Sequence, residues 1–110
     1  MSAPAGQLAA ALKSKDHDAA ALAFTQLVDT PLDARTLSAA CDLFSRNRKN
    51  QLAVDAFVKG KEAHGVPKLL AAGLSLNALL YACCREASLA ERAMEIWALM
   101  AESQVKPEAE

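Results

Sequence analysis

Apolar residues recur at intervals of three and four along most of the chain, the spacing that places side chains on one face of an α-helix. Short polar segments rich in Asp, Ser, Asn, Gly or Pro interrupt this pattern. The pattern predicts six helices, at about 5–13, 17–28, 34–46, 51–64, 76–86 and 89–103. Because the intervening segments are short, we expect consecutive helices to pack as antiparallel pairs.

Capping residues support these boundaries. Three helices are preceded by a residue whose side chain can accept a hydrogen bond from the first turn. These candidate N-caps are Asp16 or Asp18 for the second helix, Asp33 for the third and Ser75 for the fifth. Gly65 ends the fourth helix, with Pro67 beyond it. Ser88 and Glu91 form an S-x-x-E sequence, which predicts a capping box at the start of the sixth helix.

The composition favours helices over strands. Ala supplies 25 of the 110 residues and Leu 16, whereas Ile, Val and Thr together supply 9 and aromatic residues only 5%. Ala and Leu are the strongest helix formers, while sheet cores use β-branched and aromatic residues. We therefore predict an all-α protein, too short for two ordinary domains, whose small side chains let helices pack closely.

An internal repeat organises the helices. Each of three aromatic residues lies four positions after an alanine and is followed by a proline: Phe24, Phe57 and Trp97. The intervals between them are 33 and 40 residues. This period is typical of an α-solenoid of about three helix-turn-helix repeats, here about 1–33, 34–68 and 73–108, within one domain. We interpret the three aromatics as core residues of the second helices, with no ligand role.

The charge distribution is uneven although the net charge is only −1 and the pI is near 6.1. Residues 46–68 hold six Lys or Arg against two carboxylates, whereas both flanks are acidic. The chain is therefore not a globally basic nucleic-acid binder. Individual charges in the basic zone are expected to be solvated unless they fall at equivalent positions of the repeats.

The sequence lacks the motifs of several classes of enzyme. There is no glycine-rich phosphate loop, H-E-x-x-H sequence or nucleophile elbow, and we expect neither enzymatic activity nor a cofactor. We also expect no metal site, no small-molecule substrate and no membrane partner. Cys41 and Cys83 are predicted to be buried in a reducing compartment, while Cys84 could be a surface thiol. The N-terminus has neither a signal-peptide nor a transit-peptide pattern.

The third repeat resembles the pentatricopeptide repeat. Its segments read LNALLYACCR at 76–85, AMEIWALM at 93–100 and VKPE at 105–108. That family reads approximately Y-N-T-L-I-D-A-Y-C-K, then A-L-E-L-F-E-E-M, then G-I-K-P-D. The second repeat looks like a weaker copy and the first a degenerate one. About four additional residues, 69–72, precede the third repeat. The tetratricopeptide repeat is a related alternative.

The resemblance implies a groove, lined by the first helices, that holds single-stranded RNA and reads one base per repeat. The family's specifying positions fall on Ser38 with Lys68 and on Asn77 with Glu108. The first pair departs from the family pattern, because a terminal Lys is not the usual partner. Ser38 and Asn77 are expected to face the same groove, about one repeat apart.

Two arginines recur at the repeat period, independently of this code. Arg46 lies eight residues after Ser38, and Arg85 lies eight after Asn77. Cations at these positions could follow the phosphates of RNA, or could instead satisfy carbonyls at helix C-termini. Arg35 is a further candidate RNA contact, and Tyr81 could stack on a base or be a partly buried packing residue.

The sequence therefore predicts a non-enzymatic module that binds single-stranded RNA. By resemblance, its role is organellar RNA processing, stability or translation in a mitochondrion or chloroplast. The alternative is a protein–protein interaction scaffold, with a cytoplasmic location as the alternative compartment. Three repeats reach at most three bases, too few for tight recognition if each base adds about 1–3 kcal/mol.

Overall fold

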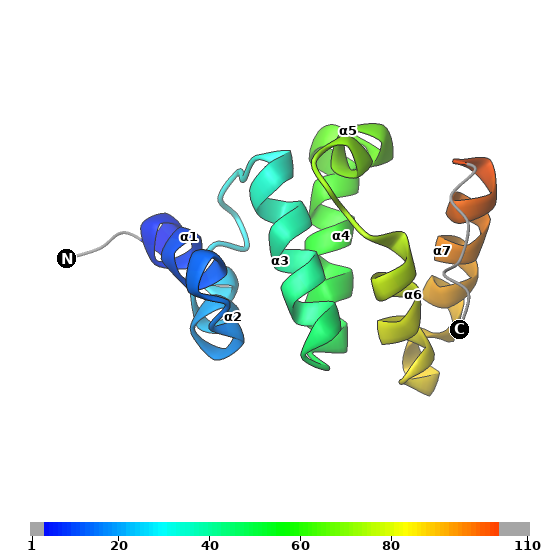
Figure 1. The fold of residues 1–110 in the computed structure, drawn as a ribbon, viewed down its shortest axis with the longest axis horizontal. Helices are drawn as coiled ribbons and strands as arrows, with labels where there is room; N and C mark the ends of the chain where they lie inside the picture. The colour runs from blue at the N-terminus through cyan, green and yellow to red at the C-terminus, as the bar shows by residue number, and fades with distance from the viewer. Residues whose placement is uncertain (1–3, 104–110) are drawn as a thin grey trace.

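The computed structural model describes residues 4–103, and all regular structure in this range is helical (Figure 1). The elements in chain order are α1 (Pro4–Ser14), α2 (His17–Thr25), α3 (Ala34–Arg46), α4 (Asn50–His64), α5 (Val66–Ala71), α6 (Leu76–Cys84), the 3₁₀ helix η1 (Ala87–Leu89) and α7 (Ala90–Glu102). The predicted all-α class is confirmed. None of the described helices is both long and apolar enough to cross a membrane.

The helices lie in a row in which sequence neighbours pack together (Figure 1). The most extensive contacts join α1 with α2, α3 with α4, and α6 with α7. Between these pairs, α3 contacts both α1 and α2, and α6 contacts both α3 and α4. Each later pair therefore meets the preceding one mainly through its first helix.

The core is a continuous layer between these helices. Phe24 of α2 meets Phe44 of α3 edge to face, with 5.6 Å between ring centroids. Phe57 of α4 is buried beside α6 in the same layer. Buried alanines, among them Ala20 and Ala53, belong to the same core and allow the helix backbones to approach.

Three predicted N-caps are present. The carboxylates of Asp16 and Asp33 accept hydrogen bonds from the backbone N–H of the third residue that follows, and Ser75 Oγ does the same. The capping box is wrong, since Ser88 lies inside η1 and α7 starts after Leu89 without a side-chain cap. Ser88 lies one residue before Leu89, which occupies the N-cap position of α7.

The short helix α5 was not predicted from the sequence. It begins after Gly65 and is followed by Gly73, both of which have positive φ (86° and 104°), so the chain turns sharply at each end. Its Leu69 is buried against Gly60 of α4, where an added Cβ would lie 2.7 Å from Leu69 Cδ2. Helix α5, which includes most of residues 69–72, thus contacts both α3 and α4.

The predicted core role of Trp97 is wrong. The inward face of α7 carries Ile96 and Met100, whereas Trp97 is 57% exposed and Met94 is 74% exposed. The cause is tertiary: within residues 4–103 no helix pair follows α7 to cover this face.

The cysteines lie where the sequence predicts. Cys41 and Cys83 are buried, and Cys84 is exposed. Burial raises the pKa of both buried thiols, that of Cys83 to about 11. A thiol with so high a pKa is almost entirely un-ionised at neutral pH and thus a poor nucleophile.

Candidate functional site

A small pocket opens between the first helices of the second and third pairs. Its volume is about 170 Å³. It is lined by residues of α3, α6 and their flanks: Ser45, Arg46, Ser75, Asn77, Ala78, Tyr81 and Arg85. The structure thereby brings together four side chains that the sequence singles out, Arg46, Asn77, Tyr81 and Arg85.

Asn77 is the unusual residue of this pocket. It lies in the first turn of α6, just after the cap Ser75, and is only 8% exposed. Its Oδ1 is fully buried and has no hydrogen-bond partner. An unpaired buried carbonyl oxygen destabilises a fold by about 1–3 kcal/mol. Because Asn77 lines the pocket, a small rotation of its side chain would present this acceptor to an N–H donor of a bound molecule.

The two arginines at the pocket differ in what they contact. Arg85 donates from one guanidinium nitrogen to the backbone oxygen of Ser45 (2.7 Å) and to Oδ1 of Asn50 (3.3 Å). Arg85 therefore binds a backbone carbonyl near the C-terminus of α3, rather than one at the C-terminus of its own helix, α6. Arg46 is exposed, and the structure gives it no hydrogen bond or ion pair within residues 4–103.

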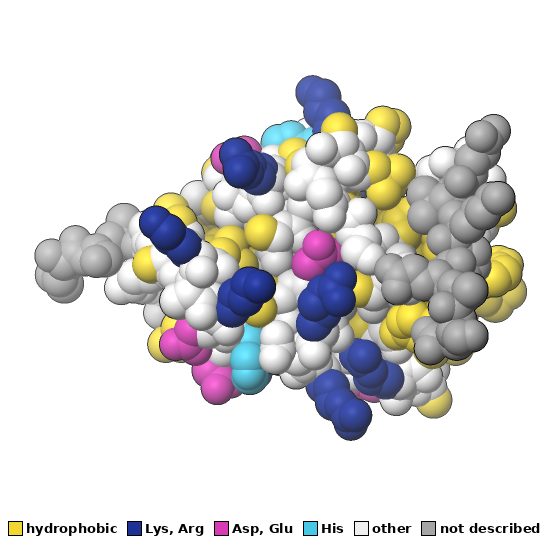
Figure 2. Space-filling model, in the orientation of Figure 1, with side chains coloured by type: hydrophobic (Ala, Val, Ile, Leu, Met, Phe, Trp, Pro, Cys, Tyr) yellow, Lys and Arg dark blue, Asp and Glu magenta, His cyan; other side chains and the backbone are white. Residues whose placement is uncertain are grey.

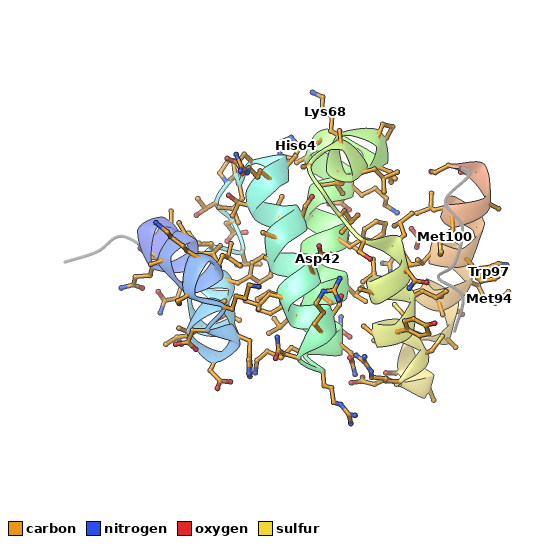
Figure 3. All side chains as sticks on the ribbon, in the orientation of Figure 1. Asp42, His64, Lys68, Met94, Trp97 and Met100 are labelled. Carbon is orange, nitrogen blue, oxygen red and sulfur yellow. The ribbon has the colours of Figure 1, made fainter. Side chains whose placement is uncertain are left out.

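Sequence reasoning missed two polar residues beside this pocket. Asn50 donates from Nδ2 to Glu86 Oε1 at 3.0 Å, which completes a network with Arg85. Asp42, on the front of α3 in Figure 3, accepts a hydrogen bond from the N–H of Ser75 at 3.1 Å. Burial raises the pKa of Asp42 above its usual value, against the lowering effect of that hydrogen bond and of the Arg46 charge. These partners lie more than 30 residues apart in sequence, so no local pattern identifies them.

The other predicted specifying pair is not at this surface. Ser38 is 1% exposed, and its Oγ donates to the backbone oxygen of Leu69 in α5 at 3.1 Å. The expectation that Ser38 and Asn77 face one groove is wrong, because α5 covers Ser38. Lys68 is exposed on α5 and points away from the row of helices (Figure 3). Glu108 lies outside the described residues.

Three lysines of the basic zone, residues 46–68, form bonds that stabilise the fold. Lys49 pairs with Asp18 at 3.0 Å, Lys59 donates to the backbone oxygen of Val28 at 2.9 Å, and Lys61 pairs with Glu95 at 2.6 Å. Each of these bonds joins α4 or its start to a neighbouring pair. The exposed cations of the zone with no such bond within residues 4–103 are Arg46, Arg48 and Lys68.

Lys and Arg side chains nevertheless outnumber carboxylates on the face shown in Figure 2. Arg35, at the start of α3, is exposed but is not among the residues that line the pocket. The surface around the pocket is therefore more basic than the net charge of −1 indicates.

A second and larger groove, of about 1070 Å³, runs along the outer side of α4 between α2 and α7. Its walls mix apolar groups such as Val28 and Val58 with charged ones such as Asp55 and Arg92. Glu95, at its edge, binds Lys61 and Arg92, and the Lys61 ammonium is the main reason that the pKa of Glu95 is lowered. None of the described residues that line this groove has a buried side-chain nitrogen or oxygen without a hydrogen-bond partner.

No set of three His, Cys, Asp or Glu side chains in the described part of the chain could hold a metal ion. Comparison of the chain with protein-family models, with characterised proteins and with solved structures gave no match.

Proposed function

We propose that this protein is a helical repeat module that binds single-stranded RNA at the pocket between α3 and α6. The observation that carries the proposal is the buried, unpartnered Oδ1 of Asn77 in a pocket flanked by Arg46 and Arg85. The resemblance of residues 76–108 to the pentatricopeptide repeat independently names Asn77 as a base-reading position.

We further propose that the three helix pairs are successive repeats of an α-solenoid. The support is the recurring contact pattern, in which α3 packs on α1 and α2 as α6 packs on α3 and α4. The mid-thirties sequence period agrees with this arrangement. RNA would then run across the first helices of the pairs.

The chemistry of the pocket suits one nucleotide. Asn77 Oδ1 accepts an N–H of a base, as an amide does in base-edge recognition. Arg46 supplies a cation for the neighbouring phosphate, and Tyr81 supplies an aromatic ring at the rim for stacking. Because α5 covers Ser38, the second repeat lacks an equivalent acceptor. We thus expect weak binding, with Kd about 10⁻⁴–10⁻⁶ M at physiological salt, typical of contacts dominated by phosphates.

The biological setting follows from the resemblance alone. We propose a non-enzymatic role in RNA processing, stability or translation in a mitochondrion or chloroplast. A second candidate function, a protein-interaction scaffold, is supported by the exposed apolar side chains Met94 and Trp97 on α7.

Fluorescence anisotropy with labelled RNA of about ten nucleotides tests the proposal. Titrations at about 50 mM and about 200 mM salt give the salt dependence of the affinity. Arg46→Gln is expected to weaken binding and to reduce the logarithmic salt slope by about 0.7, the contribution of one phosphate contact on a single strand. Asn77→Leu is expected to weaken binding with an unchanged salt slope.

The matched control is Arg48→Gln, which removes the same charge from an exposed residue that does not line the pocket. If wild-type protein retains no RNA at low salt, the proposal is wrong. The proposal also fails if Arg48→Gln and Arg46→Gln weaken binding equally, since that result indicates a diffuse charge effect rather than a site.

A further inference from the structure

Helix α7 has two apolar faces. One faces inward and carries Ile96 and Met100, both buried. The other faces outward and consists of exposed apolar residues at helical spacing, which we call the outer stripe of α7: Ala90, Met94, Trp97, Ala98 and Ala101. Figure 3 shows Met94 and Trp97 directed away from α6. The outer stripe adjoins the buried residues, since Trp97 and Met100 are only three positions apart. An apolar face this wide is usually covered across its whole width.

The internal repeat indicates what covers this stripe. Trp97 lies four residues after an alanine, as do Phe24 in α2 and Phe57 in α4. Phe24 is buried and contacts Phe44 of α3, the first helix of the following pair. Phe57 is 1% exposed in α4, on which α6 packs. Phe24 is therefore covered by the first helix of the following pair, and Phe57 is buried in the helix on which the next first helix packs. The occupant that fits the outer stripe of α7 is another such helix.

Helix α1 offers a surface of this kind. It is the first helix of its pair, and no helix pair precedes it within residues 4–103. Its inward face carries Leu8 and Ala11, and the opposite side is exposed and consists largely of small residues: Gly6, Ala9 and Ala10. An added Cβ at Gly6 would meet no heavy atom within 4 Å. Large side chains from another helix can approach such a surface closely, as Ala-rich contacts do elsewhere in this core.

The charges beside the two surfaces are complementary. Residues 4–15, which form α1 and its end, contain Lys13 and Lys15 and no carboxylate. In α7 three glutamates accompany a single arginine, and the exposed Glu91 and Glu102 flank the outer stripe. Opposite charges at the rim favour this pairing over the pairing of two α7 surfaces, where glutamates would face glutamates.

We propose that the outer stripe of α7 in one copy docks against α1 of a second copy, head to tail, so that the row of helix pairs continues from molecule to molecule. The two contacting surfaces are different, so an open assembly of any length keeps one free α7 surface at one end and one free α1 surface at the other. Such a contact extends into longer assemblies unless it closes into a ring. Assembly would bring several RNA pockets into line, but the contact itself requires no RNA.

Sedimentation velocity of the 110-residue protein without RNA, from about 10 µM to about 1 mM, tests this proposal. Trp97 is the sole tryptophan of the chain, so its emission is expected to shift to shorter wavelength as assembly buries the ring. Met94→Glu and Ala9→Glu each place a charge on one of the two surfaces and are expected to weaken association about tenfold or more. Leu22→Glu is the matched control, because Leu22 is 65% exposed on α2, away from both surfaces.

Mixing the two variants distinguishes head-to-tail from symmetric association. Ala9→Glu protein keeps an intact α7 surface, and Met94→Glu protein keeps an intact α1 surface. Each alone is expected to remain monomeric, whereas an equimolar mixture is expected to form dimers and nothing larger. Far-UV circular dichroism establishes that each variant is folded.

Three results would overturn the proposal. One is wild-type protein that stays monomeric throughout the concentration range. Another is Ala9→Glu protein that dimerises alone, which would indicate a symmetric contact between two α7 helices. The third is a Leu22→Glu variant that loses association as strongly as Met94→Glu does, which would indicate non-specific aggregation.

Discussion

Replacing Asn77 by leucine is expected to stabilise the fold while it weakens the proposed RNA binding. The two side chains branch at the same carbon, so leucine fits the space with little repacking. The substitution removes the buried, unpartnered Oδ1 from the wall of the pocket between α3 and α6. A residue kept at a cost in stability is typical of a binding site rather than of a packing position.

The magnitude follows from the burial of this residue. Asn77 is 8% exposed, so the amide oxygen is almost fully desolvated in the fold. Removing such an unpaired acceptor is expected to raise the free energy of unfolding by about 1–3 kcal/mol. The helix propensity of leucine exceeds that of asparagine by a few tenths of a kcal/mol, roughly, and acts in the same direction.

Urea denaturation followed by far-UV circular dichroism measures this change. With a slope of about 1–3 kcal/mol per molar urea, the midpoint is expected to rise by roughly 1 M. Asn50→Leu is the matched control, since Asn50 is equally buried but donates to Glu86 and accepts from Arg85. That variant is expected to be less stable than wild type by about 0.5–1.5 kcal/mol, because the hydrogen bonds to Arg85 and Glu86 are lost, while Arg85 keeps its bond to Ser45.

The reasoning is refuted if Asn77→Leu is destabilised as strongly as Asn50→Leu. That outcome would mean that the Asn77 amide is hydrogen-bonded in the free protein. A variant that is more stable and still binds RNA with unchanged affinity would leave the packing argument intact and contradict the binding role.

Three further predictions concern packing, pH dependence and thiol reactivity. Gly60→Ala is expected to lower stability by about 1–3 kcal/mol in thermal or urea denaturation, because the new Cβ would press on the buried Leu69. Gly6→Ala is expected to raise stability by about 0.5–1 kcal/mol, because the new Cβ meets no other atom and alanine favours the helix. Burial raises the pKa of Asp42, so the Asp42 carboxyl holds its proton more tightly in the folded state than in the unfolded chain. The free energy of unfolding is therefore expected to fall as pH rises from the usual Asp range through the raised pKa. Asp42→Asn is expected to flatten that part of the pH profile. In native protein a thiol reagent is expected to label Cys84 alone rapidly, with the other two cysteines reacting at the rate of unfolding; rapid labelling of more than one thiol would contradict the burial described above.

Local interactions let the sequence determine most helix boundaries. Asp33 and Ser75 cap α3 and α6 as their positions predict, because a cap needs only an acceptor and a backbone N–H three residues away. The Ala- and Leu-rich composition determined the helical class in the same way, through intrinsic propensity. The period of the aromatic residues also indicated correctly that Phe24 and Phe57 are buried.

The candidate pocket was partly predictable. The resemblance to the pentatricopeptide repeat singled out Asn77, and spacing from the positions it names singled out Arg46, Tyr81 and Arg85; all four line one pocket. The spacing could not show that Arg85 already binds the backbone oxygen of Ser45, since that bond joins residues 40 positions apart. Contacts of this range depend on how the helix pairs stack, which no local pattern encodes.

Two outcomes were decided by the tertiary structure alone. Helix α5 covers Ser38 because the chain turns at Gly65 and Gly73 and buries Leu69, so a serine with the expected spacing lost access to solvent. Trp97 has the same sequence context as Phe57 but is exposed, because burial of an aromatic ring in this fold requires the helix pair that follows it. The sequence by itself thus determined which faces of the helices are apolar, whereas only the stacking of the pairs decided which of those faces are covered.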